Sequence, residues 1–311
     1  MKETISVIGT GNMGAAISER LIRCGYDVTI FNRTAERLQS LVAIGAKVAG
    51  TAVEAINASE FAMIVLLDEK AIREAVVNGL GDADISAKRL MSVSYTSLNE
   101  IISLEKTFNR SGARLSEVSI MGYPDQILAA EARFVLAGPR QDFDSWLGIF
   151  MQLGQRVDYV GECGNATKAE MANWLSYALQ MISIAYPAAV YKREGLPLSV
   201  LSGIFTDNPN KRIPGADVAI SSMGDREYKP RFTVGAFLAS IDIVIDYTRS
   251  QGMPASLYEG VREVYQLAAD RGLGNSDVSA IFEVLYDTSG LHSQSSLGSG
   301  PNNWLPKSVQ G

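Results

Sequence analysis

Three glycines near the N-terminus have the spacing of a phosphate-binding turn. Gly9, Gly11 and Gly14 form G-x-G-x-x-G directly after an apolar run at residues 4–8, and a helical apolar pattern follows. In such a turn the first glycine permits the tight bend, the second lets the backbone approach a pyrophosphate, and the third lets helix and strand pack closely. Because a second apolar run at residues 28–31 completes a βαβ unit, the sequence predicts a dinucleotide site and not an ordinary glycine turn.

The residues after this second strand indicate which dinucleotide binds. Asn32 occupies the place where an NAD site usually carries Asp or Glu on the ribose 2′-hydroxyl. Arg33 and Arg37 can pair with a 2′-phosphate, and Thr34 can donate to it or cap the next helix. A solvated basic turn is the alternative. The pattern favours NADPH.

Apolar runs recur along the first half of the chain. Residues 61–67 and 90–94 are typical of buried parallel strands, and further strands are expected at 114–119, 133–137 and 156–160. Ligands bind past the carboxyl ends of such strands, so residues 66–68 should line the adenosine and residues 94–96 the nicotinamide. The residues expected at the cofactor are Gly9, Gly11, Asn12, Met13, Gly14, Asn32, Arg33, Thr34, Arg37, Leu66, Leu67, Asp68 and Ser94.

Composition excludes several classes of protein. The chain has 311 residues, 47% of them hydrophobic, and a net charge of −6, which fits a globular protein of two domains and argues against nucleic-acid binding. No apolar run approaches the length of a membrane span. Two cysteines and one histidine, His292 in the tail, predict neither a disulfide framework nor a metal site. Because the first strand begins at once, we expect no signal peptide and a cytoplasmic protein.

The helical pattern lengthens near residue 163. We expect a Rossmann domain over residues 1–162, a long interdomain helix over 163–194 and an all-helical C-terminal domain over 195–288. Pro187 should kink the long helix, and the Gly-x-Pro sequences at 195–197 and 252–254 should separate helices. Residues 289–311 are polar and rich in Gly and Pro, which predicts an extended or disordered tail.

Three segments carry a resemblance to a known family, namely the glycine motif with Asn32-Arg33-Thr34, the loop at 117–127 and the start of the long helix at 161–170. They resemble segments of the β-hydroxyacid dehydrogenase superfamily, including its imine reductase and reductive aminase branch. The loop reads Ile120-Met121-Gly122-Tyr123-Pro124, which is similar to the I-M-x-Y-P form of imine reductases. The resemblance covers roughly residues 4–287. It implies a 6-phosphogluconate dehydrogenase-like C-terminal domain and an intertwined homodimer.

The third segment bears on the reaction. The dehydrogenases carry G-x-G-x-x-x-K there, and the resemblance places Glu170, six residues after Gly164, at the position of their catalytic lysine. Imine reductases commonly have Asp or Tyr at this place. Lys168 lies two residues away, about 200° around a helix, and should face elsewhere; a two-residue shift of the alignment would make it the lysine instead. A carboxyl group can hold an iminium cation or protonate an imine if burial raises its pKa. A solvated helix carboxylate is the other interpretation.

Several side chains are candidates for a substrate pocket around Glu170. Asn173, Trp174 and Tyr177 share a helix face with it, and the resemblance makes Tyr177 a possible proton donor, although core packing fits it equally well. The pocket residues expected are Tyr95, Met121, Tyr123, Asn173 and Trp174, with Glu170 and Tyr177 as catalytic groups.

These observations predict an NADPH-dependent oxidoreductase that reduces C=N bonds. Its substrates would be cyclic imines, or a carbonyl compound together with an amine. Two alternatives stay open, a β-hydroxyacid dehydrogenase of the 3-hydroxyisobutyrate type and a non-catalytic NADPH-binding protein.

Overall fold

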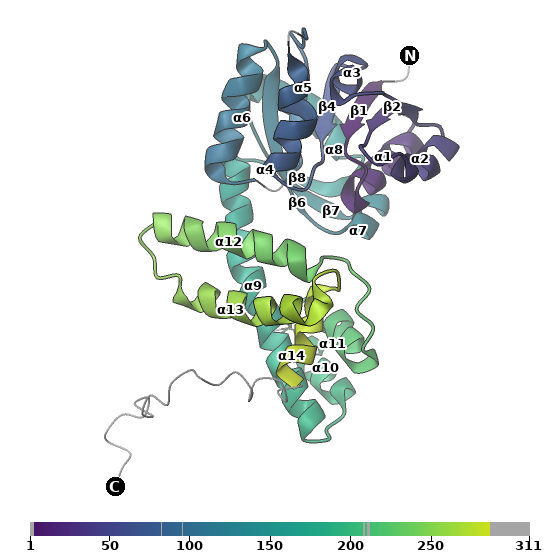
Figure 1. Cartoon of the computed structure of the whole chain (residues 1–311). Coiled ribbons are helices and arrows are strands. Elements are labelled where there is room, and N and C mark those ends of the chain that lie inside the picture. The colour runs from purple at the N-terminus through teal and green to yellow at the C-terminus, as the bar shows by residue number, and fades with distance from the viewer. Residues whose placement is uncertain (1–2, 82, 95, 208, 210–211, 287–311) are drawn as a thin grey trace. The chain divides into compact units, whose positions relative to one another are not determined.

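The chain forms two compact units, Met1–Trp174 and Leu175–Gly311. Their elements are shown in the computed structural model of Figure 1. The structure describes residues 3–81, 83–94, 96–207, 209 and 212–286. The boundary between the units falls within a single helix, α9 (Asn165–Arg193). The expected tail at 289–311 lies outside the described residues.

The described part of the first unit is built on an eight-stranded sheet of order β3-β2-β1-β4-β5-β6-β7-β8. The strands are β1 (Thr4–Ile8), β2 (Asp27–Phe31), β3 (Lys47–Val48), β4 (Phe61–Ile64), β5 (Arg89–Ser92), β6 (Arg114–Met121), β7 (Ala132–Ala137) and β8 (Gly154–Tyr159). The helical segments are α1 (Asn12–Arg23), η1 (Ala35–Leu38), α2 (Gln39–Ala43), α3 (Ala52–Asn57), α4 (Glu69–Ile72), η2 (Arg73–Val77), α5 (Asn78–Leu80), α6 (Leu98–Arg110), α7 (Pro124–Leu128) and α8 (Arg140–Phe150). This α/β architecture confirms the Rossmann-type fold that the alternating apolar runs predict.

Two features of the sheet differ from the sequence-based expectation. The short strand β3 was not predicted, because its two residues are both exposed and carry no apolar pattern. Strand β7 runs antiparallel to β6, whereas β8 is again parallel to β7. Only residues 122–131, with the short helix α7, join β6 to β7. A parallel crossover needs a dozen or more residues, so this connection favours the antiparallel pairing.

Helices cover both faces of the sheet. On one face, Ile17 of α1 and Trp146 of α8 pack in a cluster with residues of β1, β2 and β7. On the other face, Ile56 of α3 and Leu104 of α6 pack against β4, β5 and Leu115 of β6. Because side chains alternate along a strand, β6 sends Leu115, Glu117 and Ser119 to this second face.

The second unit is helical over its described residues. It contains the C-terminal part of α9 followed by α10 (Leu198–Thr206), α11 (Ala216–Asp225), α12 (Val234–Ser250), α13 (Ser256–Ala268), η3 (Ala269–Leu273), η4 (Val278–Ala280) and α14 (Ile281–Tyr286). Its core includes a stacked pair of rings, Phe237 and Tyr265, with centroids 3.9 Å apart. The breaks predicted at 195–197 and 252–254 fall between helices, as expected. No described helix is long and apolar enough to cross a membrane.

Helix α9 continues through Pro187. Proline supplies no backbone N–H, so one hydrogen bond of the helix is missing at this point. The helix ends at Arg193, whose guanidinium donates to the carbonyl oxygens of Leu285 and Tyr286, each at 2.8 Å. These contacts join the end of α9 to α14 within the second unit.

The glycine turn between β1 and α1 leaves no room for side chains. Gly9 has a φ of +99°, and a Cβ added to it would lie 2.1 Å from the carbonyl oxygen of Val65. A Cβ at Gly14 would lie 2.0 Å from the carbonyl oxygen of Gly9. Since real Cβ atoms do not approach oxygen this closely, α1 can pack here only with glycine at both positions.

We predict that Gly14→Ala lowers the denaturation midpoint and weakens dinucleotide binding, because the backbone of α1 must shift away from Gly9. The loss should be roughly 2 kcal/mol or more, within the range of backbone strain and overpacking. Urea denaturation and NADPH titration measure the two effects. The matched control is Gly148→Ala in α8, where an added Cβ meets no atom within 4 Å. This change should stabilise the protein by about 0.5–1 kcal/mol. An unchanged midpoint in Gly14→Ala would contradict the packing argument.

Candidate active site

The turn after β1 presents a helix N-terminus without a side-chain cap. Gly11 is the N-cap residue of α1 and has no side chain to bond the first backbone N–H groups. The N–H of Gly9 donates to the carbonyl oxygen of Phe31 at 2.8 Å, which fixes the turn against β2. Asn12 and Met13 begin α1, and Met13 packs against the core of this face. The uncapped N–H groups and the glycine cradle fit a pyrophosphate.

Both polar atoms of the Asn32 side chain are hydrogen-bonded to the backbone. Its Oδ1 accepts from the N–H of Thr10 at 3.2 Å and its Nδ2 donates to the carbonyl oxygen of Thr34 at 3.1 Å. It therefore shapes the loop at the end of β2. Thr34 occupies the N-cap position of η1, but its side chain makes no cap hydrogen bond, so of the two roles expected for it the structure does not support capping.

Both arginines of this loop are exposed. A guanidinium nitrogen of Arg37 lies 3.9 Å from the Cβ position built on Gly11, which places its charge beside the glycine turn. Arg33 pairs with Glu74 at 3.2 Å. Such an exposed ion pair is weak, and a more strongly charged anion can compete for Arg33.

The ends of β4 and β5 meet beside the glycine turn. The hydroxyl of Ser94 accepts from the N–H of Leu66 at 2.9 Å and donates to the carbonyl oxygen of Ile64 at 3.1 Å. The side chain of Leu66 lies against Gly9, whereas Leu67 is 75% exposed. Asp68 caps α4 by accepting from the N–H of Ala71 at 2.8 Å. Its carboxylate therefore has a structural role at the site.

Glu170 lies in the first turns of α9, where the chain buries it only partly. The indole Nε1–H of Trp174 donates to its Oε1 at 3.3 Å. Burial raises the pKa of Glu170 to about 7, although Trp174 and the hydroxyl of Ser119 lower it and the charge of Glu117 raises it further. A carboxyl group with such a pKa can exchange a proton near neutral pH.

Lys168 faces away from this group. Its side chain is exposed, and its Nζ donates to Oδ1 of Asn165 at 3.0 Å. This orientation confirms the expectation drawn from helix geometry. In the described part of the first unit, Glu170 therefore stands with Ser119 and Trp174, and Lys168 is turned toward solvent.

The other predicted pocket residues have different surroundings in the structure. Met121 packs against Val135, Ala137 and Ala166, so its side chain supports the start of α9. The N–H of Tyr123 donates to Oε1 of Gln126 at 2.9 Å at the start of α7. Asn173 is exposed. Tyr95 lies outside the described residues.

Tyr177 belongs to the second unit. Its ring lies 6.3 Å from that of Phe237 of α12, measured between centroids. This contact agrees with the packing role that the sequence also allows.

One functional candidate was not predicted from the sequence. Glu117, on β6, is only 3% exposed. Its carboxylate accepts from the N–H groups of Gly164 at 2.5 Å and Ala166 at 3.0 Å, and from the hydroxyl of Thr167 at 2.5 Å. The available signal was a charged residue within an apolar strand, since such a group must find partners when buried.

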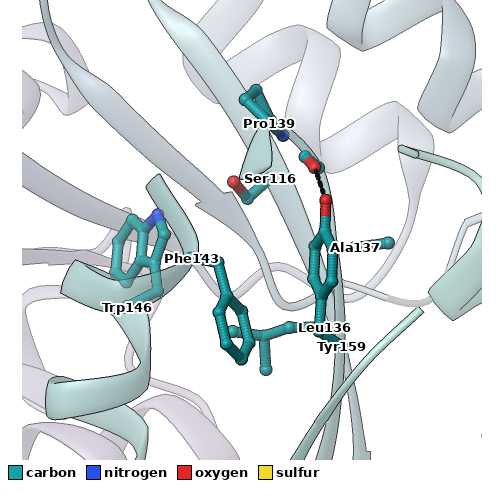
Figure 2. Close-up of a pocket in the computed structure, with 8 residues that line it drawn as sticks. Ser116, Leu136, Ala137, Pro139, Phe143, Trp146 and Tyr159 are labelled. Atoms are coloured by element: carbon teal, nitrogen blue, oxygen red, sulfur yellow. Dashed lines mark hydrogen bonds between the residues drawn. The ribbon is translucent and has the colours of Figure 1, made fainter. Parts of the chain in front are cut away.

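Figure 2 shows a small pocket on the opposite face of β6. It is lined by Ser116, Leu136, Ala137, Gly138, Pro139, Phe143, Trp146 and Tyr159. The hydroxyl of Tyr159 donates to the carbonyl oxygen of Gly138 at 2.9 Å across it. Its volume of about 10 Å³ holds one water molecule at most. This pocket is a packing feature and too small for a substrate.

The described residues contain no group of three His, Cys, Asp or Glu side chains that could hold a metal ion. The arrangement instead consists of an open phosphate cradle, a loop with two arginines and a carboxyl group of raised pKa. Together with the sheet order, these features define the first unit as a dinucleotide-binding domain.

Comparison with known proteins identifies the family. The sequence profile of the NAD binding domain of 6-phosphogluconate dehydrogenase matches residues 4–161, just over half of the chain. The chain belongs to this family and is an NAD(P)-dependent oxidoreductase of the β-hydroxyacid dehydrogenase superfamily.

Relatives and structural neighbours include two kinds of enzyme. The mitochondrial 3-hydroxyisobutyrate dehydrogenase of Drosophila melanogaster is 23% identical over 292 residues, which cover 91% of this chain and 89% of that protein. The structure of 3-hydroxyisobutyrate dehydrogenase from Salmonella typhimurium aligns with a TM-score of 0.84 at 18% identity, over 91% of this chain and all of that one. A reductive aminase from Aspergillus terreus in complex with NADPH aligns with a TM-score of 0.62 at 23% identity, over 91% and 99% of the two chains. At such identities these structural likenesses support the fold alone.

The raised pKa of Glu170 predicts pH-dependent stability. The carboxyl ionises near pH 4.5 in the unfolded chain and near pH 7 in the fold. The protonated carboxyl group therefore makes its full contribution to the free energy of unfolding below about pH 4.5. This contribution is lost as the pH rises through about 7. At about 1.36 kcal/mol per pKa unit, the loss amounts to as much as roughly 3 kcal/mol.

Glu170→Gln should remove this loss. The free energy of unfolding of the variant, minus that of the native protein, should therefore be larger at pH 8 than at pH 5. Chemical denaturation at the two pH values measures the difference. Glu131→Gln, which neutralises an exposed carboxylate of the same unit, is the control and should show little change. An equal effect of Glu170→Gln at both pH values would contradict the raised pKa.

Proposed function

We propose that this protein reduces C=N bonds with NADPH, taking cyclic imines or iminium ions as substrates. The observation that carries the proposal is Glu170, a carboxyl group with a pKa near 7 at the position where the resembling dehydrogenases have a lysine. Bound NADPH would supply a hydride to the carbon of the C=N bond.

The chemistry of a C=N bond suits a carboxyl group at this position. An iminium is already cationic, and an ionised Glu170 would hold it by a charge-assisted hydrogen bond. A neutral imine needs a proton on nitrogen, which the protonated form of Glu170 would donate. A ketone or aldehyde lacks such a basic nitrogen, and its reduction needs an acid that protonates a developing alkoxide.

The remaining pocket residues follow from the same proposal. Trp174, which bonds Glu170, would fix the orientation of the carboxyl group. Tyr123, Met121 and Asn173 would border the substrate, and Tyr95 and Tyr177 are proposed contacts on the strength of the family resemblance. Condensation of a carbonyl compound with an amine is a possible extension of the same chemistry.

The cofactor proposal rests on charge at the end of β2. The described loop from Asn32 to Arg37 offers two exposed guanidinium groups, whereas its one carboxylate is Glu36 of η1. Arg37 lies beside the glycine turn and Arg33 is held only by an exposed ion pair. These groups would pair with the 2′-phosphate of NADPH.

We predict that Arg33→Ala and Arg37→Ala raise the KM for NADPH by about 10- to 100-fold, the value of a lost charged hydrogen bond. The KM for NADH should change by less than about threefold, because NADH has no 2′-phosphate. Steady-state kinetics with both cofactors measure the ratio. Arg140→Ala, an exposed arginine of α8 that pairs with Asp144, is the control. Equal increases for both cofactors would exclude the 2′-phosphate role.

A second candidate is oxidation of a β-hydroxyacid, as in a 3-hydroxyisobutyrate dehydrogenase. The names of the relatives favour it. It requires a lysine at the substrate, and the lysine nearest to Glu170 in sequence, Lys168, is exposed and bonded to Asn165. A non-catalytic NADPH-binding protein is the third candidate.

One substrate comparison separates the three candidates. We predict turnover of 1-pyrroline-type imines with NADPH and none of 3-hydroxy acids with NADP⁺. Glu170→Gln should lower kcat for a neutral imine by about 100-fold or more, because the proton donor is lost. Lys168→Gln should leave kcat unchanged.

The reverse pattern, with hydroxyacid oxidation lost in Lys168→Gln and kept in Glu170→Gln, would establish the dehydrogenase candidate. Tight NADPH binding without turnover of either class would favour the non-catalytic candidate.

We also propose a homodimer formed through the second unit. This unit exposes large apolar side chains, among them Tyr186, Val190, Leu196, Val200, Ile204 and Leu257. A soluble monomer rarely exposes so much apolar surface, so these residues support burial against a second copy of the chain.

A further inference from the structure

Glu117 is a buried carboxylate that the proposed reaction does not use. It lies in the middle of β6 with 3% of its surface exposed. Three donors from one short segment converge on it, namely the N–H groups of Gly164 and Ala166 and the hydroxyl of Thr167. Burying a charged group is unfavourable unless it is hydrogen-bonded, and here each bond ties β6 to the beginning of α9.

The same face of β6 also reaches Glu170. Side chains two residues apart on a strand share a face, so Ser119 follows Glu117 on this side, and its hydroxyl acts on Glu170. On α9, Thr167 and Glu170 are three residues apart and occupy neighbouring positions on the helix surface. Glu117 thus holds Thr167, three residues before Glu170 on α9. We propose that Glu117 is a positioning residue, which fixes the rotation and height of the first turns of α9 so that Glu170 stands at the reacting site.

The donor set favours the ionised form of Glu117. Both N–H groups and the Thr167 hydroxyl donate to it, and the dipole at the start of a helix also favours an anion. Burial raises the pKa of Glu117 above its ordinary value, and the hydrogen bonds from Thr167, Gly164 and Ala166 oppose this shift. Its negative charge raises the pKa of Glu170 in turn. Glu117 therefore favours the protonated, proton-donating form of Glu170.

The other ionisable groups near the start of α9 are not among the causes of the pKa shift of Glu170. Lys168 is exposed and bonded to Asn165. Glu105 of α6 and Glu117 both raise the pKa of the Cys163 thiol, after burial as the largest cause, so that thiol stays neutral. Glu117 on β6 is the charged group of the described residues that shifts the pKa of Glu170.

The test uses Glu117→Gln, which keeps the shape and removes the charge. Because Trp174 bonds Glu170, its fluorescence reports the ionisation of Glu170 whether or not the enzyme turns over an imine. The full-length native protein should show a fluorescence transition near pH 7 that Glu170→Gln abolishes. In Glu117→Gln we expect this transition to move down by roughly 0.5 to 1 pH unit. The kcat for a neutral imine should fall at a correspondingly lower pH than in the native protein. The affinity for NADPH should stay within about twofold of the native value.

Glu105→Gln is the matched control, because it neutralises another partly buried carboxylate of this unit that does not act on Glu170. Its transition should stay at the native pH. If Glu117→Gln does not fold, Glu117→Asp keeps the charge on a side chain that is one methylene shorter. It should lower kcat at least tenfold while the transition moves less than about 0.3 pH unit.

This inference rests on the proposed role of Glu170, yet the two can fail separately. The positioning role would be overturned if the fluorescence transition of Glu117→Gln lay at the same pH as in the native protein. A native kcat in Glu117→Asp would also overturn it. A shifted transition in a protein that reduces no imine would instead overturn the proposed function.

Discussion

The contact between β6 and the start of α9 is the interaction on which the candidate site depends. A strand from the middle of the sheet places a carboxylate against the first N–H groups of a long helix, and Gly164, Ala166 and Thr167 satisfy it. Breaking such a buried arrangement would leave both an unpaired charge and unpaired N–H groups. The start of α9 is therefore fixed in register, and Glu170 is carried to its partly buried place beside Ser119 and Trp174.

Two helix N-termini of the first unit differ in whether a side chain of the protein bonds their N–H groups. The start of α1 has glycine at its N-cap and no capping side chain, so its positive end stays available for the phosphates of a cofactor. The start of α9 is filled by the protein's own carboxylate, Glu117. The same electrostatic property of a helix thus serves ligand binding at one site and rigid positioning at the other.

The fold by itself does not select the reaction. Structures of a 3-hydroxyisobutyrate dehydrogenase and of a reductive aminase both align over 91% of this chain, which is expected because one scaffold can support different chemistries. In the function proposed above, the distinction lies in the residue at position 170 and its surroundings. A lysine and a carboxyl group differ in charge when ionised, and burial shifts their pKa values in opposite directions.

Local sequence determined much of this protein. The glycine spacing, the alternating apolar runs and the loop from Asn32 to Arg37 predicted the Rossmann-type fold and the place of the cofactor, because these depend on steric limits and periodicities that act over a few residues. Helix periodicity also placed Lys168 away from Glu170. Only the tertiary structure decided the antiparallel course of β7 and the pairing of Glu117 with α9, because these join segments far apart in the chain. It also decided the pKa of Glu170, since burial and the charge of Glu117 arise only when β6 packs against the helix.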